Sequence, residues 1–137
     1  MHKGVKIRLE THNILFDIYK FGRKLNNEKI KNKIIKHSER DIAFINNVCL
    51  NTMRYNFHLK KIINIYIKKP PKVHEIILLK SAITQIVFLD FKEYAVINSS
   101  VEIAKKLNIF HGFINAVLKK IALDKKSLKK IKIDFRV

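Results

Sequence analysis

The sequence predicts an all-α protein with about seven helices in a single domain of 137 residues. Three observations lead to this prediction. Apolar residues recur at intervals of three and four along most of the chain, which is the spacing of an amphipathic helix. Glycine occurs three times and proline twice, so few residues would interrupt helices. Hydrophobic residues make up 47% of the chain, which is enough for a buried core.

Four helices are predicted in the first half of the chain, about residues 5–69. Gly22 suits the end of the first helix, because glycine readily adopts the left-handed conformation found there. Ser38 suits the N-cap of the third helix, and Glu39 and Asp41 in its first turn complement the helix dipole. The expected helices cover about residues 5–20, 27–37, 39–53 and 57–67.

Pro70 and Pro71 separate this half from a second one, about residues 72–122, since neither proline fits a helix interior. The helix expected over residues 73–90 is apolar on most sides, which predicts that it is the buried centre of the second half. Two further helices are expected at about residues 94–107 and 110–122.

The last segment, residues 123–137, is a basic tail with a different pattern. From Ile131 onward, apolar and charged residues alternate with a period of two. This pattern predicts either a short strand or an extended segment that leaves the domain.

The formal net charge of +18 is the strongest functional signal in the composition. A compositional bias toward isoleucine, lysine and asparagine explains part of the number of lysines. It does not explain why acidic residues number only 11. The excess predicts a polyanionic partner, with nucleic acid ahead of an acidic protein or a membrane surface. Phe16 and Tyr94 are aromatic residues available to stack on unpaired bases, and core packing is the alternative role for both.

No arrangement of residues indicates catalysis. The six histidines lack the spacing of a metal motif, and no glycine-rich phosphate loop or GxSxG sequence occurs. We therefore expect no enzymatic activity, no cofactor and no metal. The single cysteine, Cys49, lies in an apolar stripe and is expected to be buried. Without a signal-peptide core or an apolar run of membrane-spanning length, the chain is expected to be cytoplasmic.

Two asparagines, Asn98 and Asn115, stand beside apolar stripes of predicted helices. We expect both to be structural, with each amide tying one helix to a neighbouring turn. Direct contact with RNA is the alternative role.

Three segments resemble the NusB-like family, which includes transcription antitermination factors and the leading domain of cytosine-C5 methyltransferases of small-subunit rRNA. The resemblance extends in order over residues 8–122, with a weaker match in RLETHNILFDIYKFGRKL (8–25). Two short sequences within these segments, NAVLKK and TMR, resemble the methyltransferase domain more closely than the antitermination factors. The three segments are SERDIAFINNVCLNTMRY (38–55), KSAITQIVFLDFKEYAVINSSVEIAKKL (80–107) and GFINAVLKKIA (112–122).

The resemblance implies a helical bundle of two packed halves that binds RNA, namely rRNA or its leader, without catalysing a reaction. It also implies a small ribosomal-subunit protein as a partner. Two alternatives remain: a targeting domain of, or detached from, an rRNA methyltransferase, and a protein-interaction scaffold. The residues that the resemblance assigns to RNA binding are Lys3, Lys6, Arg8, Phe16, Lys105, Lys106 and His111.

Overall fold

The computed structural model describes residues 2–131, and this part of the chain is helical with no strand. The all-α prediction is therefore confirmed. The described part contains eight α-helices and one π-helical segment, η1. Their bounds are α1 Lys3–Phe21, α2 Glu28–Ile35, α3 Glu39–Arg54, α4 Asn56–Tyr66, α5 Val73–Ile83, η1 Thr84–Phe88, α6 Glu93–Lys106, α7 His111–Leu123 and α8 Lys125–Ile131.

The helix ends follow the signals in the sequence. Gly22 ends α1 in the left-handed conformation, with φ of 66°. The Ser38 hydroxyl accepts a hydrogen bond from the Asp41 backbone N–H at 3.2 Å, so it is the N-cap of α3. These local contacts explain why the sequence predicted the first seven helices close to their observed positions.

The helix expected over residues 73–90 changes geometry near its end. After Ile83 the backbone widens into η1, where the Leu89 N–H donates to the Thr84 carbonyl at 3.0 Å. A π turn of this kind inserts an extra residue per turn and redirects the side chains that follow. One side chain in this segment is Gln85, which contacts α1.

The eighth helix was not predicted from the sequence. Lys125–Ile131 form α8 within the segment described above only as a basic tail. Leu128 is buried, and the Nζ atoms of Lys125 and Lys129 lie 3.2 and 2.8 Å from the Asp90 carboxylate. These contacts attach α8 beside the end of η1. The remaining alternating residues, 132–137, lie outside the described part of the chain.

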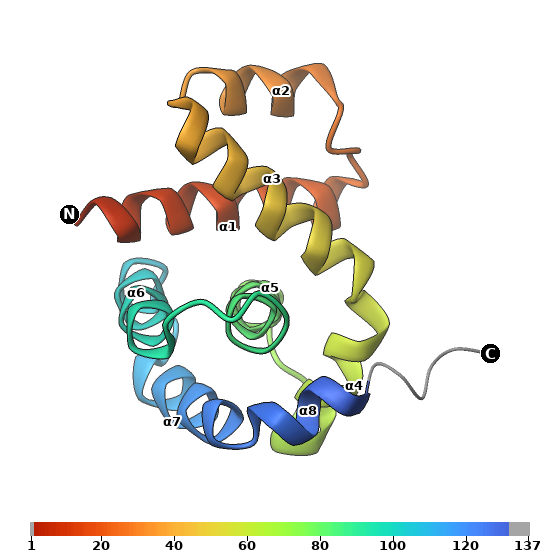
Figure 1. Ribbon diagram of the computed structural model, residues 1–137, viewed down its shortest axis with the longest axis vertical. Helices are drawn as coiled ribbons and strands as arrows, with labels where there is room; N and C mark the ends of the chain where they lie inside the picture. The colour runs from red at the N-terminus through yellow and green to blue at the C-terminus, as the bar shows by residue number, and fades with distance from the viewer. Residues whose placement is uncertain (1, 132–137) are drawn as a thin grey trace.

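The centre of the molecule is α5, which Figure 1 shows end-on with α1, α3, α4, α6, α7 and α8 around it. Every residue from 77 to 87 is buried, which confirms the expected central position of this segment. Burial on all sides explains why its apolar residues are not restricted to one stripe.

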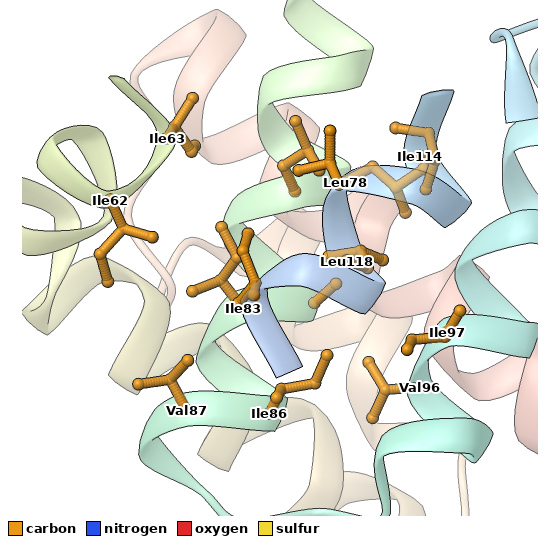
Figure 2. Close-up of a cluster of buried hydrophobic side chains, with 14 of the residues drawn as sticks. Ile62, Ile63, Leu78, Ile83, Ile86, Val87, Val96, Ile97, Ile114 and Leu118 are labelled. Atoms are coloured by element: carbon orange, nitrogen blue, oxygen red, sulfur yellow. The ribbon is translucent and has the colours of Figure 1, made fainter. Parts of the chain in front are cut away.

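Two hydrophobic clusters fill the space between the helices. The larger one joins α5, η1, α6 and α7, and Figure 2 shows its side chains gathered between these elements. It also contains Leu59, Ile62 and Ile63 of α4, so the cores do not divide at Pro70 and Pro71. The smaller cluster holds α1, α2 and α3 together and includes Ile77 of α5. Each fully buried isoleucine or leucine contributes about 1.5–3 kcal/mol to folding.

One buried cation lies between the elements of this core. Lys80 of α5 is 4% exposed, and its Nζ donates to the Asn56 side-chain oxygen at 2.7 Å. It also lies 4.8 Å from the centre of the Tyr19 ring, and the Tyr19 hydroxyl donates to the same oxygen at 3.2 Å. Within residues 2–131 no carboxylate pairs with this ammonium group. Burial, followed by repulsion from Lys60, lowers the pKa of Lys80 to about 8.

Candidate nucleic-acid interface

The N-terminal end of α1 presents two unpaired lysines. Lys3 and Lys6 are both exposed, and neither forms an ion pair with a residue in the described range. The first turn of α1 contains no acidic residue, and the His2 ring accepts a hydrogen bond from the Gly4 N–H at 3.2 Å. The positive end of the helix dipole therefore adds to the two ammonium charges.

Hollows lie on both sides of this helix end. The α1/α3 hollow is lined by His2, Lys3, Gly4, Ile7, Arg8, Arg40, Asp41 and Phe44. On the opposite side, two adjoining hollows between α1 and α6 form what we term the α1/α6 groove. Its lining residues are His2, Gly4, Val5, Arg8, Tyr94, Ala95, Asn98, Ser99, Glu102, Lys105 and Lys106.

The structure brings Lys105 and Lys106 to the same place as the start of α1. Both are exposed at the C-terminal end of α6 and line the α1/α6 groove with His2 and Val5. Figure 1 shows the beginning of α1 beside α6. Basic residues from two segments about 100 positions apart thus lie on either side of one groove. The Glu102 carboxylate is also in the groove, and it lies 3.6 Å from the Lys105 ammonium group.

Arg8 contacts its own protein rather than extending into solvent. Its Nε donates to the Gln85 side-chain oxygen at 2.7 Å, and its Nη1 donates to the Gly4 carbonyl at 3.3 Å. The guanidinium group lies 5.2 Å from the centre of the Phe44 ring. Partial burial lowers the pKa of Arg8. This arginine connects α1, α3 and η1, and it lines both the α1/α3 hollow and the α1/α6 groove.

Phe16 belongs to the interior side of α1. It packs against the smaller hydrophobic cluster, and its ring stacks on the His74 ring with 4.4 Å between centroids. His74 in turn lies 2.9 Å from the His12 ring nitrogen, which connects α1 to α5. The structure therefore places Phe16 in a packing role, and it lines neither the α1/α3 hollow nor the α1/α6 groove.

His111 is separate from the groove. It is the first residue of α7, is exposed, and lies 6.5 Å from the neighbouring Phe110 ring. It lines none of the hollows around α1. Of the seven predicted RNA-binding residues, Arg8, Lys105 and Lys106 line the α1/α6 groove, and Lys3 lines the α1/α3 hollow. Lys6 is exposed on α1 but lines neither, and Phe16 and His111 lie elsewhere.

Neither asparagine makes the interhelical hydrogen bond expected of a structural amide. Asn98 is exposed on α6 and lines the α1/α6 groove, and Asn115 is half-buried on α7. Within residues 2–131, neither amide has a hydrogen-bond partner. A polar residue beside an apolar stripe lies at the boundary between core and surface, and the pattern did not show on which side each amide points.

Two groups at the interface were assigned no role from the sequence. Arg40 lies in the first turn of α3 and lines the α1/α3 hollow with Phe44. Gln85 is 3% exposed and holds Arg8. The sequence contains no signal for the Gln85 contact, because it depends on the crossing of α1 and η1. The described residues contain no cluster of three or more metal-ligating side chains and no helix long and apolar enough to cross a membrane.

Comparison with known families supplies the identification. The model of the NusB family matches residues 5–123, which is most of the chain. The chain belongs to the NusB family. The matched region includes α1 from Val5 onward and continues to the end of α7, so α8 lies outside it. No curated protein and no solved structure matches the chain. Membership of the NusB family indicates an RNA-binding role of the antitermination type.

Proposed function

We propose that this NusB-family protein binds rRNA or its leader through the α1/α6 groove and the exposed lysines at the start of α1, and acts, in the cytoplasm, in antitermination, processing or modification of rRNA. The observation that carries the proposal is the position of four exposed lysines around the start of α1. Lys105 and Lys106, at the end of α6, line the α1/α6 groove. Lys3 lines the α1/α3 hollow, and Lys6 is exposed one turn further along α1. In this role the chain is non-catalytic.

The charge distribution around the groove suits a phosphate backbone. Lysine ammonium groups neutralise phosphates without regard to sequence, and the N-terminal end of α1 adds a positive partial charge. Glu102 is the acidic residue in the lining of the groove, and Asp41 lines the α1/α3 hollow on the other side of α1. The phosphates are therefore expected to follow the lysine-bearing rims, with Glu102 balanced by Lys105.

This proposal predicts a steep salt dependence of RNA binding. The logarithm of the association constant should fall linearly with the logarithm of the salt concentration, with a slope of roughly −0.7 per single-strand phosphate contacted. Four lysine contacts give a slope near −3. Filter binding to rRNA-leader fragments between low and high salt measures it. Binding that does not change with salt would exclude the lysine-rich groove as the RNA site.

A second candidate function, protein binding, is favoured by a hollow on another face. It lies between α2 and α3 and is mostly apolar, with Ile35 and Leu50 exposed at its edge. Segment 23–36 around it carries six basic residues and one acidic residue, Glu28. Charge complementarity therefore favours an acidic segment with an apolar face. The resemblance implied a small ribosomal-subunit protein, and we propose that such a partner would dock here through an acidic segment.

The protein-binding candidate predicts selective capture of an acidic amphipathic helix. A fluorescent peptide of leucine and glutamate in helical register should bind, whereas the same peptide with lysine in place of glutamate should not. Leu50→Lys places a charge at the edge of the hollow and is expected to weaken binding at least tenfold. Fluorescence anisotropy measures both effects. Equal binding of the two peptides, or no effect of Leu50→Lys, would rule out this hollow as the docking site.

A further inference from the structure

Tyr94 is a largely exposed aromatic side chain. It lies in the first turn of α6 and is 67% exposed. No ring contact or hydrogen bond of Tyr94 occurs within residues 2–131. Its ring lies between two hollows, since it lines both the α1/α6 groove and a separate hollow between α6 and α7. An exposed ring with space on both sides suits stacking by a planar ligand.

The second hollow, here termed the α6/α7 hollow, combines an apolar lining with a few polar groups. It measures about 370 Å³ and is lined by Glu93, Tyr94, Ile97, Asn98, Lys119, Ala122 and Leu123. Leu123 is 87% exposed at its rim. This combination of apolar walls and few polar groups is typical of sites for small planar molecules.

Asn98 supplies the polar group between the two hollows. It follows Tyr94 by one helical turn, so both side chains lie on the same face of α6. Its amide has no hydrogen-bond partner in the described part of the chain and carries both donors and an acceptor. An amide of this kind can pair with the edge of a nucleobase that stacks on the neighbouring ring.

Lys119 supplies a charge on the α7 side of the hollow. It is exposed and forms no ion pair within residues 2–131, so it is available to a phosphate. Glu93 is the acidic member of the lining, and its carboxylate lies 3.9 Å from the Lys125 ammonium group. This ion pair offsets part of the repulsion that Glu93 would exert on an anionic ligand.

We propose that the α6/α7 hollow is a nucleobase site for single-stranded RNA. One base stacks on Tyr94, its edge pairs with the Asn98 amide, and Lys119 binds the adjoining phosphate. The strand then continues along the exposed face of α6 into the α1/α6 groove, where Lys105 and Lys106 bind its backbone. A duplex is excluded from the hollow, because neighbouring base pairs cover both faces of each base. This inference rests on the proposed RNA-binding function.

The absence of tryptophan from the sequence allows a direct test of stacking. Tyr94→Trp introduces a unique tryptophan, whose fluorescence should be quenched by single-stranded oligoadenylate and should not be quenched by an RNA duplex. Ile65→Trp is the matched control, because Ile65 is 49% exposed on α4 and lines none of the hollows beside α6. Its fluorescence should not change with either RNA.

Affinity measurements with variants that contain no tryptophan complete the test. Tyr94→Ala should weaken binding of single-stranded RNA by roughly 5- to 150-fold, which is the range for loss of one stacked base. Tyr94→Phe should bind almost as tightly as wild type, since it keeps the ring. Asn98→Ala should reduce the preference among oligoadenylate, oligouridylate and oligocytidylate.

The outcomes separate this inference from the function on which it rests. If wild-type protein binds RNA with the expected salt dependence but Tyr94→Ala binds equally well and Tyr94→Trp is not quenched, the nucleobase site is wrong and the RNA-binding groove stands. If wild-type protein binds no RNA at all, both proposals fail. Equal quenching at Tyr94→Trp and Ile65→Trp would also overturn the nucleobase site, because it would show nonspecific contact.

Discussion

Replacing both Lys3 and Lys6 with glutamate is expected to weaken RNA binding roughly 10- to 100-fold, because two phosphate contacts are lost and two repulsive charges appear. The fold should not change. Both lysine side chains are exposed. The introduced glutamates would lie near the start of α1, where acidic side chains complement the helix dipole. Filter binding and thermal unfolding of the double variant measure the two effects.

The matched control is the double replacement of Lys68 and Lys69 by glutamate. These lysines are exposed in the connection between α4 and α5 and line none of the hollows around α1. The control changes the net charge by the same amount. An equal loss of affinity in the two double variants would mean that RNA binds to the overall charge of the protein rather than to the lysines at the start of α1.

Arg8 is left out of this test because it has a structural role. It holds Gln85 and the Gly4 carbonyl and lies over Phe44, so its replacement would remove contacts that join α1 to α3 and η1. Loss of RNA binding in an Arg8 variant would combine unfolding with loss of charge. The two exposed lysines avoid this ambiguity.

The second large effect concerns stability. Lys80→Met is expected to raise the free energy of unfolding at pH 7 by about 1–2 kcal/mol, because it removes an ammonium group that has no anionic partner in the described part of the chain. Asn56 still accepts a hydrogen bond from the Tyr19 hydroxyl, so no acceptor is left unpaired. Chemical denaturation of both proteins measures the difference.

The gain should disappear at alkaline pH. The pKa of Lys80 is lowered in the folded state from 10.5 to about 8, so between these values the unfolded chain binds more protons than the folded protein. The contribution of Lys80 to the free energy of unfolding of the wild-type protein therefore rises between about pH 8 and pH 10.5. The advantage of Lys80→Met should shrink by roughly 2 kcal/mol between pH 7 and pH 10.

Lys126→Met is the control for loss of a lysine in general. Lys126 is exposed on α8 and forms no ion pair within residues 2–131, so its replacement should change the free energy of unfolding by less than about 0.5 kcal/mol at either pH. A Lys80→Met variant less stable than wild type at pH 7 would show that the contacts with Asn56 and Tyr19 outweigh the desolvation of the charge.

The fold was predictable because its signals are local. The apolar spacing of α1–α7, the Ser38 cap and the Gly22 end each depend on residues close in sequence. The π geometry of η1 and the docking of α8 depend on distant contacts instead. Leu128 and the pairing of Lys129 with Asp90 stabilise α8, and nothing near residue 128 in the sequence indicates that Asp90 is its neighbour.

The candidate interface was predictable only in part, for the same reason. Net charge and family resemblance indicated the lysines, whose exposure follows from their chemistry. They did not separate Arg8, which Gln85 holds, from the free lysines beside it. They also did not show that Phe16 stacks on His74 or that the Asn98 amide faces a hollow. Each of these outcomes depends on how helices from different parts of the chain cross.

The salt dependence of RNA binding by the Lys3→Glu, Lys6→Glu double variant tests the central claim most directly. Two lost contacts at about 0.7 each should make the slope of the log–log plot less negative than wild type by about 1.4. The Lys68→Glu, Lys69→Glu control should keep the wild-type slope. A double variant at Lys3 and Lys6 with the wild-type slope would contradict the proposal that the lysines at the start of α1, beside the α1/α6 groove, bind the RNA backbone.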